Sequence, residues 1–426
     1  MAPPRSRLRP QSLAFTLLLG ALVTLASFAT DMGLPVLAET AQSLGVTPAR
    51  AGLTFSVFMA GFALGPLVFG PLSDRFGRRP MLLGGVAVFA IFGALATVAR
   101  SLETLLVYRA LMGIGAGTAQ VLVLAMVRDL FTGQEARTQQ SYVNMAGGIA
   151  PIIAPTLGVA IARLGGWRTI YGALAGGALV LLMIAARQLG ESAPQHSGAA
   201  LTFRRTIANY ARVLRHPVSL GYALVVALGF GCLFAYVSGS SLVLIGLLGA
   251  TQQFYGLLFA CTALGLMAGA FTNARLSRRG ASHTRIITAG LSVIATTTTM
   301  LVLLTLVGAV RIWTLVPLLM IGNVAYGMVR PNAAQGALEP MPEIVGVASA
   351  LLAGLQMVAG AVASAVAASL FDGRSALAMT GTMAVCALGA LGVYLFMVRP
   401  AERRLGAAHG GPDDDVLAES AAIIAA

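Results

Sequence analysis

One carboxylate and one guanidinium lie well inside long apolar stretches of the sequence. Asp31 is the only one of the 15 acidic residues in such a position, and Arg109 is the only basic residue. A buried charge is costly, so residues of this kind are candidates for function by default. All four histidines lie outside the apolar stretches. Asp31 is therefore the candidate proton carrier.

The depths of these two residues match. Asp31 precedes the end of one stretch by about six residues, and Arg109 follows the start of another by about six, which is ~9 Å of helix in each case. An ion pair between them would lower the cost of burying both. One interpretation is a fixed structural pair. The other is a proton switch, because burial favours the neutral carboxyl and a neighbouring guanidinium favours the carboxylate.

A second cluster of polar residues forms a tight turn between two apolar stretches. Its glycines permit the turn and close helix approach, and its acidic residue can accept hydrogen bonds from a helix terminus or an arginine. The simpler interpretation is a basic loop on one side of a membrane; we favour a conformational switch. The residues concerned are Gly70, Asp74, Arg75, Gly77, Arg78 and Arg79.

A third feature is a pair of prolines within one apolar stretch. Pro151 and Pro155 must each disturb the hydrogen-bond ladder of a helix. A kinked helix can serve as a moving part or a seal, and the alternative is a kink that is merely tolerated.

Composition places these residues in a membrane. The chain has 426 residues, of which 57% are hydrophobic and only 10% charged, against about 25% charged in soluble domains. A membrane core of ~30 Å needs ~20 apolar residues per helix. We predict an all-α membrane protein of twelve transmembrane helices in two six-helix bundles, with spans at 12–37, 49–71, 80–99, 103–127, 141–162, 167–189, 217–243, 251–274, 285–308, 312–334, 344–370 and 375–398.

The arginines predict the orientation of these spans. All 28 basic residues are arginine, and with the amino terminus inside, 21 fall on the inner side, six on the outer side and one within a span. This bias indicates that both termini are cytoplasmic. It also accounts for the net charge of +13 without nucleic acid as a partner. We expect a bacterial inner-membrane protein, in contact with lipid, that is a monomer.

The order of the spans predicts five segments. They are a cytoplasmic amino terminus at 1–11, a first bundle at 12–189, a cytoplasmic linker at 190–216, a second bundle at 217–398 and a disordered tail at 399–426. Apolar residues at helical spacing in the linker predict an amphipathic helix on the inner leaflet, with a solvated linker as the alternative. Leu72-Ser73 recurs as Leu276-Ser277, which indicates a weak repeat between the two halves.

Other classes of site are excluded or disfavoured. Each of the three cysteines lies in an apolar run without CxxC spacing, so we expect no metal site. The sequence lacks a phosphate-binding GxxxxGK[ST] loop and a catalytic triad. We therefore expect neither an enzyme nor an ATP-driven pump, and no cofactor other than protons as the coupling ion.

Several of these motifs resemble a known family. The turn at 70–79 resembles the signature loop of major facilitator transporters, and residues 108–115 resemble the motif of their fourth helix, whose arginine is implicated in proton coupling. Pro155 and Gly158 resemble the antiporter motif of helix five. Closer similarity to the Bcr/CflA drug-efflux subfamily is carried by residues 30–35, 127–131, 166–168, 331–333 and 346–351.

The resemblance implies proton-coupled export of small, moderately lipophilic molecules, as in bicyclomycin and chloramphenicol exporters. An exporter or proton symporter of an endogenous metabolite such as an amino acid or a sugar is the first alternative, and a receptor or scaffold without flux is the second. We expect a substrate cavity between the bundles near the midplane, with candidate lining residues Phe28, Met59, Asn144, Met145, Phe234, Tyr236, Asn323 and Gln356.

The orientation gives a first testable prediction. In a variant without native cysteines, single cysteines in place of Thr47 or Gly373 should react with an impermeant thiol reagent on intact cells. Cysteines in place of Arg78 or Arg279 should react only after permeabilisation, because the arginine bias places them inside. Rapid labelling of the latter two on intact cells would invert the topology.

Overall fold

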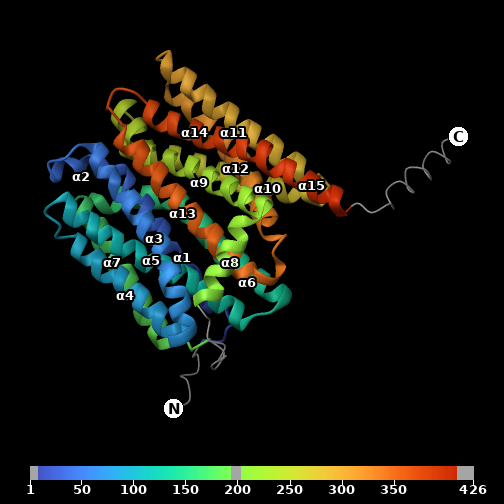
Figure 1. Ribbon diagram of the computed structural model, residues 1–426. Coiled ribbons are helices and arrows are strands. Elements are labelled where there is room, and N and C mark those ends of the chain that lie inside the picture. Colours follow the sequence, from blue (N-terminus) through green and yellow to red (C-terminus); the bar gives the residue numbers. More distant parts are fainter. Residues whose placement is uncertain (1–7, 193–202, 410–426) are drawn as a thin grey trace.

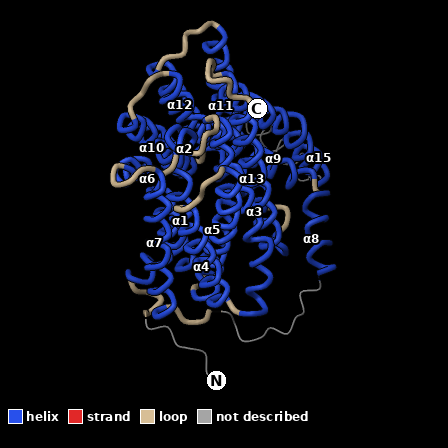
Figure 2. The backbone as a smooth tube through the Cα atoms, turned by 90° about the vertical axis from the view of Figure 1, so that its left-hand side faces the viewer, coloured by secondary structure: helices blue, strands red, loops and turns tan. Residues whose placement is uncertain are grey.

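The computed structural model describes residues 8–192 and 203–409, without the side chains of Pro71, Asp74, Arg137, 203–207 and 405–409. The described chain consists of helices joined by short loops (Figure 2). It contains twelve helical segments that are long and apolar enough to cross a membrane. The predicted fold class, an all-α membrane protein with twelve spans, is confirmed.

The first six spans form one bundle, drawn in blue to green in Figure 1. The first span is interrupted and consists of three short helices. The elements are α1 (Leu13–Asp31), the 3-10 turn η1 (Leu34–Val36), α2 (Leu37–Ser43), α3 (Pro48–Phe76), α4 (Arg78–Ala96), α5 (Leu102–Leu130), α6 (Gly133–Ala162) and α7 (Trp167–Gln188).

The last six spans form the second bundle, drawn in yellow-green to red. A separate helix, α8 (Phe203–Arg215), lies between the bundles in sequence. The elements of the second bundle are α9 (Pro217–Ser241), η2 (Leu242–Leu247), α10 (Gln252–Arg278), α11 (His283–Leu306), α12 (Ile312–Leu338), η3 (Pro342–Ile344), α13 (Val345–Ser369), α14 (Leu377–Val393), η4 (Tyr394–Val398) and α15 (Arg399–His409).

Glycines allow the helices of each bundle to pack backbone against backbone. A Cβ atom on Gly113 of α5 would lie 2.1 Å from the carbonyl oxygen of Phe58 in α3, and one on Gly61 of α3 would lie 2.1 Å from that of Ala110. Gly269 of α10 lies against α12 in the same way. Lipid provides no hydrophobic drive for helix association, so van der Waals contact between closely packed small residues holds the helices together.

The two bundles meet at the end of the molecule that carries α2, here called the α2 end. The hydroxyl groups of Ser56 in α3 and Ser364 in α13 are 3.1 Å apart and buried. One turn away, a Cβ on Gly52 would lie 3.0 Å from the Cβ of Ala368. The bundles are therefore closed against each other at the α2 end.

The bundles separate toward the opposite end, here called the α8 end (Figure 1). Along α3, Phe58 is fully buried, whereas Leu64 and Leu67 are 50% and 47% exposed. Met145, in the half of α6 toward the α8 end, is 55% exposed. The side chains of these helices are therefore less closely packed toward the α8 end than at the α2 end.

One predicted boundary is wrong. The sequence predicts a disordered tail from residue 399, but the last span continues as η4 and α15 to His409. The hydroxyl of Tyr222 in α9 donates a hydrogen bond of 2.6 Å to Glu402 of α15, which ties this extension to the second bundle. Residues 410–426 lie outside the described part of the chain.

The close approach of α3 and α5 gives a second prediction. Gly113→Ala should lower the melting temperature of the purified protein, because the new methyl group must push the helices apart at a cost of about 1–3 kcal/mol. Gly84→Ala on α4 is the matched control, since its Cβ would meet nothing within 4 Å. Equal melting temperatures for the two variants would show that this contact is not tight.

Candidate functional site

The first span breaks at Asp31. Helix α1 ends there, and the next regular turn, η1, contains Pro35, which has no N–H to continue the ladder. The last carbonyl groups of a helix have no partner within it. The break therefore makes carbonyl oxygens available inside the first bundle.

Arg109 of α5 uses one of these oxygens. Its Nη1 donates 2.9 Å to the carbonyl of Ala29 in α1, and its Nε donates 3.3 Å to the carbonyl of Thr54 in α3. The guanidinium carbon lies 4.3 Å from the ring centre of Phe58, and the residue is 1% exposed. Arg109 thus links three helices through hydrogen bonds and a cation–π contact.

The expected ion pair between Asp31 and Arg109 is not formed. Within the described residues, Arg109 has no carboxylate within salt-bridge distance. The physical reason is that backbone carbonyls and an aromatic ring already surround the guanidinium, so no carboxylate is needed to bury it.

Asp31 instead lies next to the second bundle. Its side chain is 5% exposed, and it lies near the phenol groups of Tyr236 in α9 and Tyr255 in α10. The break after Asp31 brings η1 into contact with both of these helices. The only carboxylate deep in a span therefore lies at the junction of the two bundles.

The tyrosines belong to a buried polar network. Tyr236 and Thr262 share a hydrogen bond of 2.5 Å between their hydroxyls, and Tyr255 shares one of 2.8 Å with Ser240. Asn323 of α12 donates to the carbonyl of Thr262 at 3.0 Å. This network holds the tyrosine hydroxyls near Asp31 in place within the second bundle, and the sequence did not single out Tyr255 or Thr262.

Helix α6 lies directly against the break in the first span. A Cβ on Gly158 would lie 2.2 Å from the carbonyl oxygen of Met32, so only glycine allows this approach. Pro151 and Pro155 lie within the continuous helix α6. Thr156, between Pro155 and Gly158, contacts Gly256 of the second bundle. The segment of α6 that contains the prolines therefore contacts both the break in the first span and helix α10 of the second bundle.

The turn at 70–79 is fixed by carboxylates from elsewhere in the first bundle. Arg78 forms an ion pair of 3.0 Å with Asp129 at the end of α5. Glu191, which follows α7, accepts from the backbone N–H groups of Arg78 and Arg79 at 2.8 and 3.2 Å. A carboxylate at a helix N-terminus is favourable, and Gly77 supplies the positive φ of 96° that the turn requires.

The remaining residues of this turn are placed less firmly. Arg75 lies 5.4 Å from the ring centre of Phe76, Gly70 has open space around its Cα, and the side chain of Asp74 lies outside the described part of the chain. The sequence reasoning missed Glu191. Its only signal was a lone acidic residue directly after the sixth span.

The eight candidate cavity residues occupy different surroundings. Phe28 and Met59 pack in the core of the first bundle, Phe234 reaches that core from α9, and Asn144 and Met145 are exposed on α6. Tyr236 and Asn323 belong to the buried network, and Asn323 lines a cavity inside the second bundle. Gln356 is buried on α13, where its side-chain oxygen has no partner among the described residues. Their assignment to one substrate site stays a prediction.

Comparison with known proteins identifies the family. The model of the Major Facilitator Superfamily matches residues 17–364. The chain belongs to the Major Facilitator Superfamily. Its fold resembles that of a D-xylose–proton symporter, with a TM-score of 0.71 at 18% identity over 91% of this chain and 98% of that one. It is therefore a multi-pass membrane transporter and not an enzyme.

Its relatives include proteins named for drug resistance. The chain is 27% identical over 387 residues to a bicyclomycin resistance protein homologue of Haemophilus influenzae, covering 90% of this chain and 96% of that protein. It is 26% identical to multidrug resistance protein D of Escherichia coli, covering 85% and 90%. It is also 30% identical to the uncharacterized MFS-type transporter YdgK of Bacillus subtilis, covering 83% and 88%.

Arg109 gives a third prediction. Arg109→Lys should destabilise the protein, because an ammonium group cannot donate to two carbonyls on different helices and stack on Phe58 at once. A lost hydrogen bond to a charged group costs about 1.5–3 kcal/mol. Arg100→Lys, in an exposed loop, is the control. If both variants melt at the same temperature in detergent, the guanidinium does not hold the three helices together.

Proposed function

We propose that this transporter exports small, moderately lipophilic drugs or toxic metabolites in exchange for protons. The observation that carries the proposal is the buried carboxyl of Asp31 at the junction of the two bundles, near Tyr236 and Tyr255. A buried carboxyl can take up and release a proton as its surroundings change. The drug-resistance names of the relatives support the choice of substrate class.

The shape supports exchange by alternating access. The bundles are closed at the α2 end and separated at the α8 end. The arginine bias favours a cytoplasmic position for the α8 end. In this orientation the structure has the form of an inward-facing transporter, ready to receive a substrate from the cytoplasm.

The coupling step that we propose lies between the bundles. In this scheme the hydroxyl dipoles of Tyr236 and Tyr255, which lie near Asp31, attract the charged carboxylate. A proton taken up from outside would neutralise Asp31 and weaken this attraction. The bundles could then rearrange, and release of the proton to the cytoplasm would restore it. Arg109 has a positioning role here, since it holds the break that presents Asp31.

The site also constrains the charge of the substrate. Asp31 is the only acidic residue deep in a span, and in this scheme it carries the proton. No second carboxylate is left to neutralise a cation, so we expect neutral or zwitterionic substrates. Exchange of one neutral molecule for one proton moves charge inward, which gains ~2.3 kcal/mol per 100 mV of membrane potential.

The fourth prediction tests the coupling. In proteoliposomes, Asp31→Asn should abolish export driven by a proton gradient but retain exchange of labelled for unlabelled substrate, because a neutral side chain mimics the protonated carboxyl permanently. Glu103→Gln is the control, since Glu103 is exposed at the α2 end. Uphill export at the wild-type rate by Asp31→Asn would remove Asp31 from the coupling mechanism.

The substrate class needs its own test. A drug-susceptibility panel in an efflux-deficient bacterial host, with and without this protein, should show resistance to neutral or zwitterionic antibiotics. No change in susceptibility to any drug, from a protein that is expressed and folded, would favour the alternative of an endogenous metabolite.

A further inference from the structure

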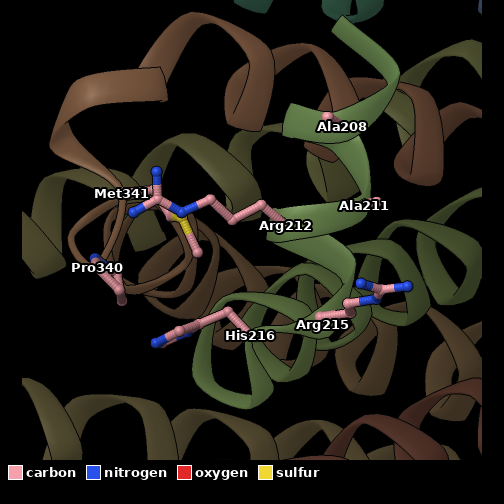
Figure 3. Close-up of a pocket in the computed structure, with 7 residues that line it drawn as sticks. All are labelled: Ala208, Ala211, Arg212, Arg215, His216, Pro340 and Met341. Carbon is pink, nitrogen blue, oxygen red and sulfur yellow. The ribbon is translucent and has the colours of Figure 1, made fainter. Parts of the chain in front are cut away.

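A crevice at the α8 end is not used by the proposed transport cycle. It lies between α8 and the connection from α12 to α13, where Pro340 and Met341 form the opposite wall (Figure 3). Helix α8 contributes four residues to the crevice, and their spacing along the sequence places them on one face of the helix. These are Ala208, Ala211, Arg212 and Arg215.

Packing fixes the orientation of this face. Val213 of α8 is 3% exposed and forms a small apolar core with Met341 and Ala348. This contact attaches α8 to the beginning of α13 in the second bundle. The neighbouring Leu214 is 42% exposed, so a different side of the helix remains open to lipid.

The crevice is lined by hydrogen-bond donors. Arg212 and His216 extend across it toward Met341 and Pro340, whereas the guanidinium of Arg215 points away from these two residues (Figure 3). His216 caps α9, where its Nδ1 accepts from the N–H of Ser219 at 3.3 Å. An accepting Nδ1 carries no proton, so the imidazole hydrogen lies on Nε2, which is a donor.

One acidic group competes for these donors. Glu343 of η3 forms an ion pair of 2.5 Å with Arg212, and the two side chains are 49% and 57% exposed. Exposed ion pairs contribute little to stability. An anion in the crevice can therefore replace Glu343 as the partner of Arg212 at low cost.

We propose that this crevice binds the phosphate of an anionic phospholipid in the cytoplasmic leaflet. Its position supports a lipid, because Pro217, directly after His216, begins a membrane span, so the crevice lies at the level of the head groups. Helix α8 carries four arginines and no acidic residue, which suits an anionic surface. The alanines on this face of α8 leave an apolar floor for the lipid glycerol. The inference rests on the proposed orientation and not on proton coupling.

Native mass spectrometry of the full-length protein with phosphatidylglycerol tests the proposal, with phosphatidylcholine of the same chain length as reference. Arg212→Gln should weaken phosphatidylglycerol binding about fivefold. His216→Asn should weaken it too, because asparagine keeps the cap of α9 but does not place a donor at the position of Nε2. Arg285→Gln, an exposed arginine outside the crevice, should leave binding unchanged.

Glu343→Gln separates this proposal from simple loss of charge or fold. It should strengthen phosphatidylglycerol binding, because it frees Arg212. Unchanged or weaker binding by this variant would overturn the proposal, as would equal binding of phosphatidylcholine. Displacement of the lipid by inorganic phosphate at comparable concentration would make the crevice a site for soluble anions and would also overturn it.

Discussion

A guanidinium group that is 1% exposed must find its hydrogen-bond acceptors inside the protein, because neither lipid nor water can supply them there. In the first bundle, the interrupted first span supplies one acceptor at Ala29, and the close approach of α5 to α3 brings a second at Thr54 within reach. That approach requires glycine at position 113, one turn from Arg109. The break, the glycine contact and the buried charge therefore depend on one another, and together they define the conformation of the first bundle.

Because backbone carbonyls accept the hydrogen bonds of Arg109, the carboxyl of Asp31 is not needed as its ion-pair partner. Asp31 lies near the tyrosines of the second bundle, and helix α6 packs against the break in the first span through Gly158. A charge whose partners lie across the boundary between two bundles responds to their relative position, whereas a charge paired within one bundle does not. This difference allows a buried arginine and a buried aspartate at similar depth to have separate roles, the arginine in holding the first bundle together and the aspartate in the coupling that we propose.

The apolar spans and their lengths were sufficient to predict the fold, because a membrane leaves few alternatives to a helix bundle. The buried positions of Asp31 and Arg109 could also be predicted, since charged residues are conspicuous in apolar sequence. The groups that contact these two residues could not be predicted. Depth along a helix says nothing of direction around it, and the carbonyls at the break cannot be recognised from side-chain types. Glu191 was missed for a related reason. It accepts hydrogen bonds from the N-terminus of α4, which is distant in sequence, and no motif in α4 indicates that a carboxylate binds there.

Between α3 and α13, the contact at the α2 end is made by small side chains. A methyl group on Gly52 would already lie 3.0 Å from Ala368, and the neighbouring serines contact each other directly. These positions leave no room for a water molecule between α3 and α13. Glycine, alanine and serine bury little apolar area, but Leu34, Leu37 and Phe55 of the first bundle pack in the apolar core of the second bundle at the same end. Opening the α2 end therefore requires both the separation of closely packed backbones and the exposure of these larger apolar side chains.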